Sequence, residues 1–303
     1  MKGNSNIRGS TGLEREFIKD FNSLSDSHNA WAVWQDFVDM SAYSLANTVD
    51  KRDEVWKKRE AAYLEIVKKY SREELDTIVK LFATTVMALE DNPAQDFLGK
   101  LFMNFNFGGR SGQFFTPWNV AELMAELEIG GDFQQRLANE NYLSVNDPAC
   151  GAGCMLIAFA NVCRRNYGVN YQQSIFFVAQ DIDPVVAKMC YIQLSLLGCP
   201  GYVVIGNTIT SPVLGSVLNP YYDPPENLWF TPFYFSTVWN IRRLSESLCA
   251  LMEKVPPEPE TNRPEVYQKH TPPKSRTTPI SRPVKTKMSF SIRDFFKKGS
   301  KKK

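Results

Sequence analysis

The order of strand and helix patterns over residues 141–207 constrains the fold of this chain more than any other feature. Three β-rich runs, "NYLSV", "SIFFVAQ" and "YVVIG", alternate with two helical segments, "MLIAFANVCRRN" and "PVVAKMCYIQLSLLG". Strands that alternate with helices of this length form parallel sheets with right-handed crossovers. The sequence therefore predicts an α/β fold that contains half of a Rossmann-like sheet.

The turn after the first expected strand, "NDPACGAGC", carries two glycines directly before a helix. In open parallel sheets, ligands bind beyond the carboxyl ends of the strands. Gly151 and Gly153 would permit positive φ there and would keep side chains away from a ligand. The spacing is not the GxGxxG of dinucleotide sites. Two interpretations stay open, a loop for a nucleoside-type ligand and a plain tight turn.

Polar residues also follow the second and third expected strands. Asp181 is placed to bind a ribose diol, whereas Asp183, directly before Pro184, is expected to cap the next helix. Asn207 could read an adenine edge, although Gly-Asn is also a common turn.

The flanking regions differ in composition from this α/β core. Residues 12–106 are predicted to form a helical domain, in which Ser71 and Glu74 have capping-box spacing and Asn92-Pro93 ends a helix. Residues 107–253 follow as the Rossmann-like domain. Residues 1–11 and a Pro-rich basic linker at 254–287 are expected to be disordered, and residues 288–303 form a short basic tail.

Charge is distributed unevenly along the chain. Residues 254–303 hold 14 Lys/Arg and 4 Asp/Glu, which gives +10, so the +2 of the whole chain leaves 2 − 10 = −8 for residues 1–253. An acidic body is not typical of a strong nonspecific DNA binder. No apolar run is long enough for a membrane span, and no CxxC pair indicates a metal site. We therefore expect a cytoplasmic protein without a metal.

Four motifs carry a resemblance to a known family. "GQFFTPWNVAELM", "DPACGAGCMLIAF", "AQDIDPVVAKMCYIQLSLLG" and "GNT" occur in this order. Together they resemble the modification subunits of prokaryotic type I restriction systems, which are N6-adenine DNA methyltransferases that use S-adenosylmethionine. The resemblance covers roughly residues 70–210, and "QFFTP" taken alone is equally consistent with a buried aromatic turn. It implies cofactor contacts for Gln113, Phe114, Thr116, Pro117, Asp147, Pro148, Ala149, Gly151, Gly153, Asp181, Ile182 and Asn207.

The catalytic motif of this family is degenerate here. The family holds the target amine with Asn/Asp-Pro-Pro-aromatic and stacks the flipped base on the aromatic ring. Asp223, Pro224 and Pro225 match its first three positions, but Glu226 stands where the aromatic is required. Asn219 is followed by only one proline before its aromatics. A Pro-rich surface loop is the competing interpretation of this segment.

The region after the degenerate motif is also short for a methyltransferase. One aromatic run, "WFTPFYFSTVW", and one amphipathic helix precede the linker. The run could cover an exposed sheet edge or form a partner surface. Two hypotheses follow. One is an enzyme that methylates DNA adenine, with a specificity or second methyltransferase subunit as a candidate partner. The other is a non-catalytic scaffold that binds the cofactor and a sliding clamp or partner subunit.

The basic tail ends in "SFSIRDFFKKGSKKK". Ile292, Phe295 and Phe296 have the spacing of one helical turn and resemble a sliding-clamp (PCNA-type) interaction box, with Ser289 in the glutamine position. The tail is thus a candidate for binding a sliding clamp. Plain contact with nucleic acid, or neither of these, stays open.

Overall fold

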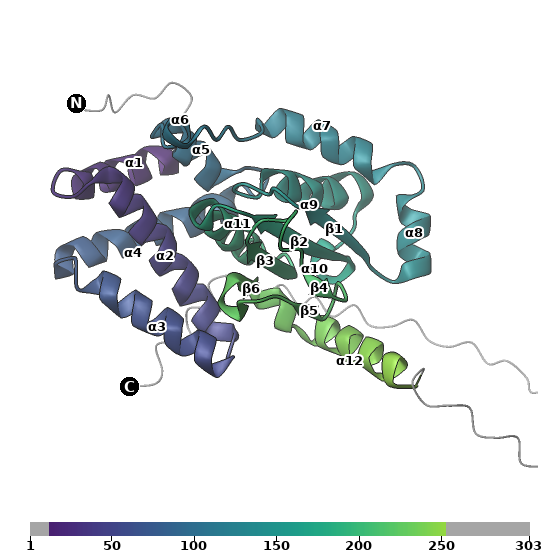
Figure 1. Cartoon of the computed structure of the whole chain (residues 1–303). Helices are drawn as coiled ribbons and strands as arrows, with labels where there is room; N and C mark the ends of the chain where they lie inside the picture. The colour runs from purple at the N-terminus through teal and green to yellow at the C-terminus, as the bar shows by residue number, and fades with distance from the viewer. Residues whose placement is uncertain (1–11, 253–303) are drawn as a thin grey trace, which may run out of the picture. The chain divides into compact units, whose positions relative to one another are not determined.

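The computed structural model describes residues 12–252, which form a mostly helical α/β fold around one small mixed sheet (Figure 1). A first compact unit ends at Leu244, and a second begins at Ser245. The α/β class predicted from the sequence is therefore confirmed. Ile292, Phe295 and Phe296 of the proposed clamp motif lie outside the described residues. None of the helices between residues 12 and 252 has the length and apolarity that a membrane span needs.

The N-terminal region is helical, as predicted. In α4, Ser71 accepts a hydrogen bond from the Glu74 backbone, and the Glu74 carboxylate accepts one from the Ser71 backbone, which confirms the predicted capping box. Asn92 caps the other end of this helix. The helices of this region are α1 (Gly12–Ser25), α2 (Ala30–Val49), α3 (Asp53–Val67), α4 (Arg72–Asp91) and α5 (Phe97–Asn104).

The sheet contains three parallel strands joined by helices. β1 (Leu143–Asp147) pairs with β2 (Ile175–Asp181), and β2 pairs with β3 (Gly201–Ile205). The connections are α9 (Cys154–Tyr167) and α11 (Pro184–Leu196). This succession matches the one predicted from the sequence, and it places the ends of all three strands at one edge of the sheet.

The fourth strand, β6 (Leu228–Phe230), pairs with β3 in the antiparallel direction, so the order is β1-β2-β3-β6. The aromatic run that contains β6 buries Phe230 and Tyr234 in one core cluster with Trp239, whereas Trp229 packs on the other face of the sheet against Tyr43 and Tyr191. Of the two roles considered for this run, covering a sheet edge is the one that the structure shows. It covers the edge of β3 and leaves β1 at the other end of the sheet.

The remaining elements are short apart from two helices. They are α6 (Gly108–Ser111), α7 (Trp118–Ile129), α8 (Phe133–Glu140), α10 (Tyr171–Ser174), β4 (Leu214–Gly215), β5 (Pro220–Tyr221), η1 (Pro225–Asn227), η2 (Pro232–Phe235) and α12 (Thr237–Met252). β4 and β5 pair only with each other in the described part of the chain.

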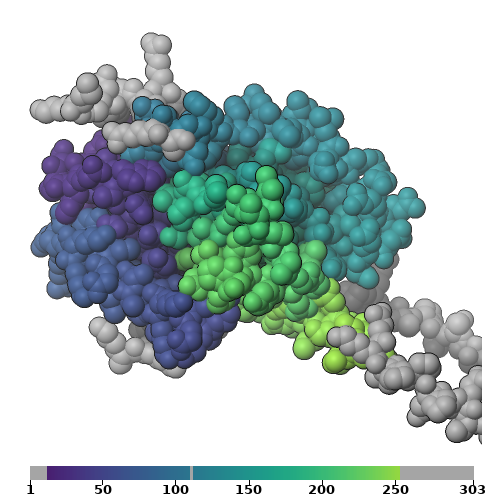
Figure 2. Space-filling model, viewed as in Figure 1, coloured from purple at the N-terminus to yellow at the C-terminus, as the bar shows by residue number. Residues whose placement is uncertain are grey.

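The N-terminal helices pack directly on the sheet region. α2 lies against α11, and the Lys188 ammonium forms a 2.6 Å ion pair with Asp39 across this contact. On the face seen in Figure 2, the segment that follows β3 (green) lies between the N-terminal helices (purple and blue) and the α7–α8 region (teal). The helical region thereby borders the loops at the strand ends.

Candidate functional site

The carboxyl ends of the parallel strands surround a pocket of about 420 Å³, which we call the strand-end pocket. Its volume lies within the range of roughly 300–1,000 Å³ that is usual for small-molecule sites. It is lined by Gln113, Phe114, Phe115, Pro148, Ala149, Gly151, Asp181, Ile182, Val186, Gly206, Asn207, Thr208 and Ile209. Most of the residues for which the family resemblance implies cofactor contact are thus brought together, from segments almost 100 residues apart in the chain.

Asp181 holds the glycine loop in place. One oxygen of its carboxylate accepts a hydrogen bond from the Gly151 backbone at 2.8 Å, and the other accepts one from the Asp183 backbone at 2.9 Å. The Cys150 backbone donates to the Gln180 carbonyl at 3.0 Å. Each carboxylate oxygen keeps capacity for a further hydrogen bond. Asp181 is therefore fixed in orientation and still able to accept from a ligand hydroxyl.

Asp183 has the structural role predicted for it. Its carboxylate accepts hydrogen bonds from the backbones of Val185 and Val186 at the start of α11, which confirms the helix cap. The second carboxylate oxygen accepts from the Gln113 side chain at 3.0 Å. This contact ties the segment before α7 to the end of β2.

Phe115, for which the sequence predicted no role, forms the inner wall of the 113–117 segment. Its ring stacks on Phe102 with centroids 5.2 Å apart, and it faces the loop at Gly151. Phe114 points outward and is 81% exposed. Thr116 and Pro117 are not part of the lining: the Thr116 carbonyl accepts from Cys154, and Pro117 precedes α7.

The two glycines of the loop have different surroundings. Gly151 lines the strand-end pocket with φ of 53°, and a Cβ there would meet the Phe115 ring at 3.4 Å. Gly153 has φ of 94° and lies outside the lining, and a Cβ there would approach the Cys190 sulfur to 2.8 Å. Gly153 thus permits close packing of the loop on α11, whereas Gly151 keeps the pocket open.

The buried side-chain amide of Gln193 holds the loop between β1 and α9 in place by hydrogen bonds. The Gln193 side chain is fully buried and donates to the Ala152 carbonyl at 2.8 Å and to Asp96 at 2.7 Å. Its carbonyl oxygen accepts from the Leu98 backbone at 3.1 Å. No sequence signal marks Gln193, because its partners lie 41 and 95 residues away.

The segment after β3 closes one side of the pocket. The Asn207 side chain accepts hydrogen bonds from the backbones of Ile209 and Thr210, so it forms a turn as well as lining the pocket. The Thr208 hydroxyl donates to the Pro148 carbonyl at 2.6 Å and joins this turn to the glycine loop. Ile209 is 92% exposed and Ile182 is 65% exposed. A planar ring of a bound ligand could pack against these exposed apolar side chains and shield them from water.

Asp147 lies at the end of β1 beside the loop, outside the lining of the strand-end pocket. Its carboxylate accepts a hydrogen bond from the Ala149 backbone at 3.1 Å. Burial raises the pKa of Asp147, and the charge of Asp181 adds to the increase, which the hydrogen bond from Ala149 only partly offsets. Folding therefore disfavours the ionised form of Asp147, while its hydrogen bond with Ala149 shapes the turn.

None of the predicted catalytic residues Asn219, Asp223, Pro224 and Pro225 lines the strand-end pocket, although the hydroxyl of the buried Tyr222 lies against Gly206, which does. Asn219 and Asp223 are exposed and absent from the lining. Pro224 precedes η1 and Pro225 is its first residue, beside β6 at the β3 end of the sheet. Of the two interpretations of this segment, the described contacts fit a surface loop that joins β5 to β6.

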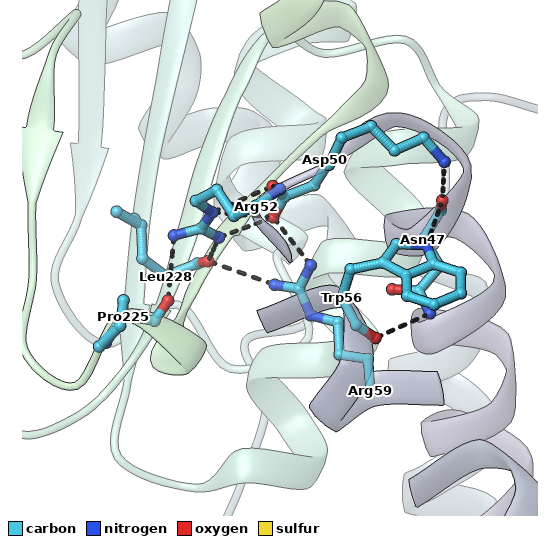
Figure 3. A network of polar contacts seen from close by, with 8 residues as sticks. Asn47, Asp50, Arg52, Trp56, Arg59, Pro225 and Leu228 are labelled. Carbon is cyan, nitrogen blue, oxygen red and sulfur yellow. Dashed lines mark hydrogen bonds and ion pairs between the residues drawn. The ribbon is translucent and has the colours of Figure 1, made fainter. Parts of the chain in front are cut away.

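The end of this loop is attached to the N-terminal helices (Figure 3). The Arg52 guanidinium donates to the Pro225 carbonyl at 3.1 Å and to the Leu228 carbonyl at 2.6 Å. Glu226, which replaces the expected aromatic, pairs with Lys58 of α3 at 2.8 Å. The segment is thus a docking element for α3.

A buried ion-pair network stabilises this attachment (Figure 3). Asp50 binds Arg52 at 2.7 Å and the buried Arg59 at 2.8 Å. Burial alone would raise the pKa of Asp50, but the hydrogen bonds and charges of the two arginines outweigh it and lower the pKa. The Arg59 guanidinium also lies over the Trp229 ring, 4.2 Å from its centroid. These contacts hold β6 against α3.

Comparisons with known proteins agree with this geometry. Residues 95–244 match the family described as N-6 DNA methylase. A protein of Heyndrickxia coagulans named "Type II restriction enzyme and methyltransferase RM.BcgI" is 33% identical over 131 residues, covering 34% of this chain and 19% of the relative. The chain therefore spans about a fifth of the length of that relative. No solved structure matches.

Proposed function

Because residues 95–244 match the N-6 DNA methylase family, we propose that this chain binds S-adenosylmethionine and serves the methylation of adenine N6 in DNA. The observation that carries the proposal is the strand-end pocket, which unites the glycine loop, Asp181 and Asn207 at three successive strand ends. We propose further that the parallel strands are half of a Rossmann-like methyltransferase sheet, in which ligands bind at this edge.

The residues present fit this cofactor. Asp181, already oriented by Gly151, is suited to accept hydrogen bonds from the two ribose hydroxyls. Ile182, Ile209 and Phe114 offer exposed apolar surface to the adenine ring and its neighbourhood. The missing side chain at Gly151 leaves room for the methionine part. The bound cofactor would supply an electrophilic methyl group, and the chain's own contribution is to hold and orient it.

The part of the site that would bind the adenine, the acceptor of the methyl group, is less complete in this chain. The adenine amine is a poor nucleophile, because its lone pair is delocalised into the ring, and it needs an amide or carboxylate to accept its hydrogens. Asn219 and Asp223 stay the chain's candidates for this role, yet neither lines the pocket. This observation favours the second candidate function, a non-catalytic scaffold that binds the cofactor and a sliding clamp or partner subunit.

We also propose that DNA contact requires basic residues outside the acidic region 1–253. Phosphate neutralisation requires basic surface, and the net charge of +10 over residues 254–303 is the main reserve of it in the sequence. Binding of a sliding clamp by Ile292, Phe295 and Phe296 stays a prediction, as does location in the cytoplasm.

Calorimetric titration with S-adenosylmethionine tests the proposal. We expect saturable binding that Asp181→Ala weakens by about 30-fold or more, because hydrogen bonds to a charged group contribute roughly 1.5–3 kcal/mol each. Asp91→Ala, which removes an exposed carboxylate far along α4, is the matched control and should bind like wild type. Absence of heat for wild type at high protein concentration would refute cofactor binding.

Transfer of a labelled methyl group to mixed-sequence DNA then separates the two candidate functions. Activity of the purified chain that is lost in Asp223→Ala or Asn219→Ala supports the enzyme. Cofactor binding without transfer supports the scaffold.

A further inference from the structure

Within residues 12–252, the outer edge of β1 has no strand partner. In the described part of the chain β1 pairs with β2 alone, and β6 covers the opposite end of the sheet (Figure 1). An edge strand presents a row of free N–H and C=O groups that can pair with another strand. Natural edges are usually blunted with Lys, Pro or a bulge, and the sequence "LSVND" of β1 has neither Lys nor Pro. The edge is therefore open to pairing.

A groove of about 450 Å³ runs along this edge, and we call it the β1 groove. All five residues of Leu143–Asp147 line it, and α7, α8 and α9 form its walls. The wall side chains are mainly apolar, and Met124 of α7 is 48% exposed. The groove thus offers main-chain partners and apolar contacts over the length of one short strand. Its apolar wall residues include Met124, Ala125, Ile129, Phe133, Met155 and Leu156.

The rim of the β1 groove is acidic. Glu128 and Asp147 line it together with a single cation, Arg136. Asp132, four residues before Arg136, adds another exposed carboxylate. None of these four residues takes part in an ion pair within residues 12–252. An occupant with basic residues at its ends would complement this rim, whereas a second copy of the same groove would bring like charges together.

We propose that the β1 groove binds an extended segment of a second polypeptide, which adds a strand to β1, with apolar residues at alternate positions and basic residues at its ends. In such strand addition, main-chain hydrogen bonds give affinity and alternate side chains give specificity. The described strands do not supply this segment, because β4 pairs with β5 and β6 pairs with β3.

The position gives the added strand a functional consequence, which rests on the proposed function. A strand parallel to β1 ends beside Asp147 and the glycine loop, so the residues that follow it reach the edge of the strand-end pocket. Asn219 and Asp223 do not line that pocket. The second polypeptide would therefore complete the acceptor side of the site.

A synthetic peptide probes the β1 groove. Lys-Arg-Ile-Thr-Val-Thr-Ile-Lys-Lys, labelled at one end, is titrated into the full chain by fluorescence anisotropy. We expect saturable binding and slowed hydrogen exchange of the amides in β1. The control peptide Lys-Arg-Ile-Pro-Val-Pro-Ile-Lys-Lys keeps the charge but cannot form the ladder, since proline has no N–H, and it should not bind.

Charge reversal tests the rim. Glu128→Lys combined with Asp132→Lys should weaken binding about tenfold, since two attractive charges become repulsive. Asp76→Lys combined with Glu90→Lys makes the same charge change on exposed sites of α4 and should leave binding unchanged. Equal binding of the proline peptide, protection elsewhere than β1, or no peptide binding would overturn the proposal. Titration of S-adenosylmethionine in the same samples separates this failure from failure of the proposed function.

Discussion

The two glycines of the loop between β1 and α9 should respond differently to the same substitution. Gly153→Ala places a Cβ 2.8 Å from the Cys190 sulfur at a φ of 94°, deep in the packing between the loop and α11. Gly151→Ala places a Cβ at ordinary contact distance, 3.4 Å from Phe115, but inside the strand-end pocket. We therefore expect the first variant to lose stability and the second to lose cofactor affinity.

The magnitudes follow from three contributions. An alanine in the left-handed region costs about 1–2 kcal/mol, and overpacking of a tight core site costs a further 1–3 kcal/mol or so. Reduced freedom of the unfolded chain offsets about 0.4–1 kcal/mol of this. Gly153→Ala should thus lower the free energy of unfolding by roughly 1–4 kcal/mol, whereas Gly151→Ala, without the overpacking contribution, should lower it by only about 0–1.5 kcal/mol.

Urea unfolding of both variants, with titration of S-adenosylmethionine, is the assay. Cys190→Ala removes the sulfur that Gly153→Ala would meet, so the double variant should be more stable than the sum of the single effects by about 1 kcal/mol. Additive effects in this cycle, or equal destabilisation by the two glycine substitutions, would refute the assignment of packing to Gly153 and of ligand space to Gly151.

Three other changes test separate parts of the account. Burial raises the pKa of Asp147, so this carboxyl contributes stability that is present below pH 3.8 and lost as the pH rises through its folded pKa. Asp147→Asn should therefore stabilise the fold at pH 7. In unfolding curves measured below pH 3.8, the difference in stability between this variant and wild type should vanish. Arg59→Leu removes a buried partner of Asp50 and should cost about 2–4 kcal/mol in urea unfolding; an unchanged midpoint would show that the network does not hold β6. Asp223→Ala should leave the affinity for S-adenosylmethionine within about twofold of wild type, because Asp223 is outside the strand-end pocket; a large calorimetric loss would place it in the cofactor site.

Local signals in the sequence predicted much of this fold. The capping box at Ser71 and Glu74 and the cap at Asp183 depend on residues within a few positions of one another, and both are present. The succession of strands and helices over residues 141–207 likewise reflects local periodicity. It was sufficient to place the glycine loop and Asp181 at one edge of the sheet.

Long-range contacts were not predictable in the same way. The support of the loop by Gln193 and the attachment of Pro225 to Arg52 join residues 41 and 173 positions apart, and no short motif encodes either. The degenerate motif at Asp223 shows the converse. Its residues resemble a catalytic motif, but Asn219 and Asp223 do not line the strand-end pocket, and the end of the motif binds Arg52 and Lys58 through Pro225 and Glu226.

Hydrogen exchange of the full chain with and without S-adenosylmethionine shows both whether the cofactor binds and whether it binds in the strand-end pocket. We expect slowed exchange at Gly151, in residues 113–115 and in residues 206–209, together with unchanged exchange in α4. Saturating cofactor that leaves these segments unprotected, or that protects another region instead, would contradict this expectation.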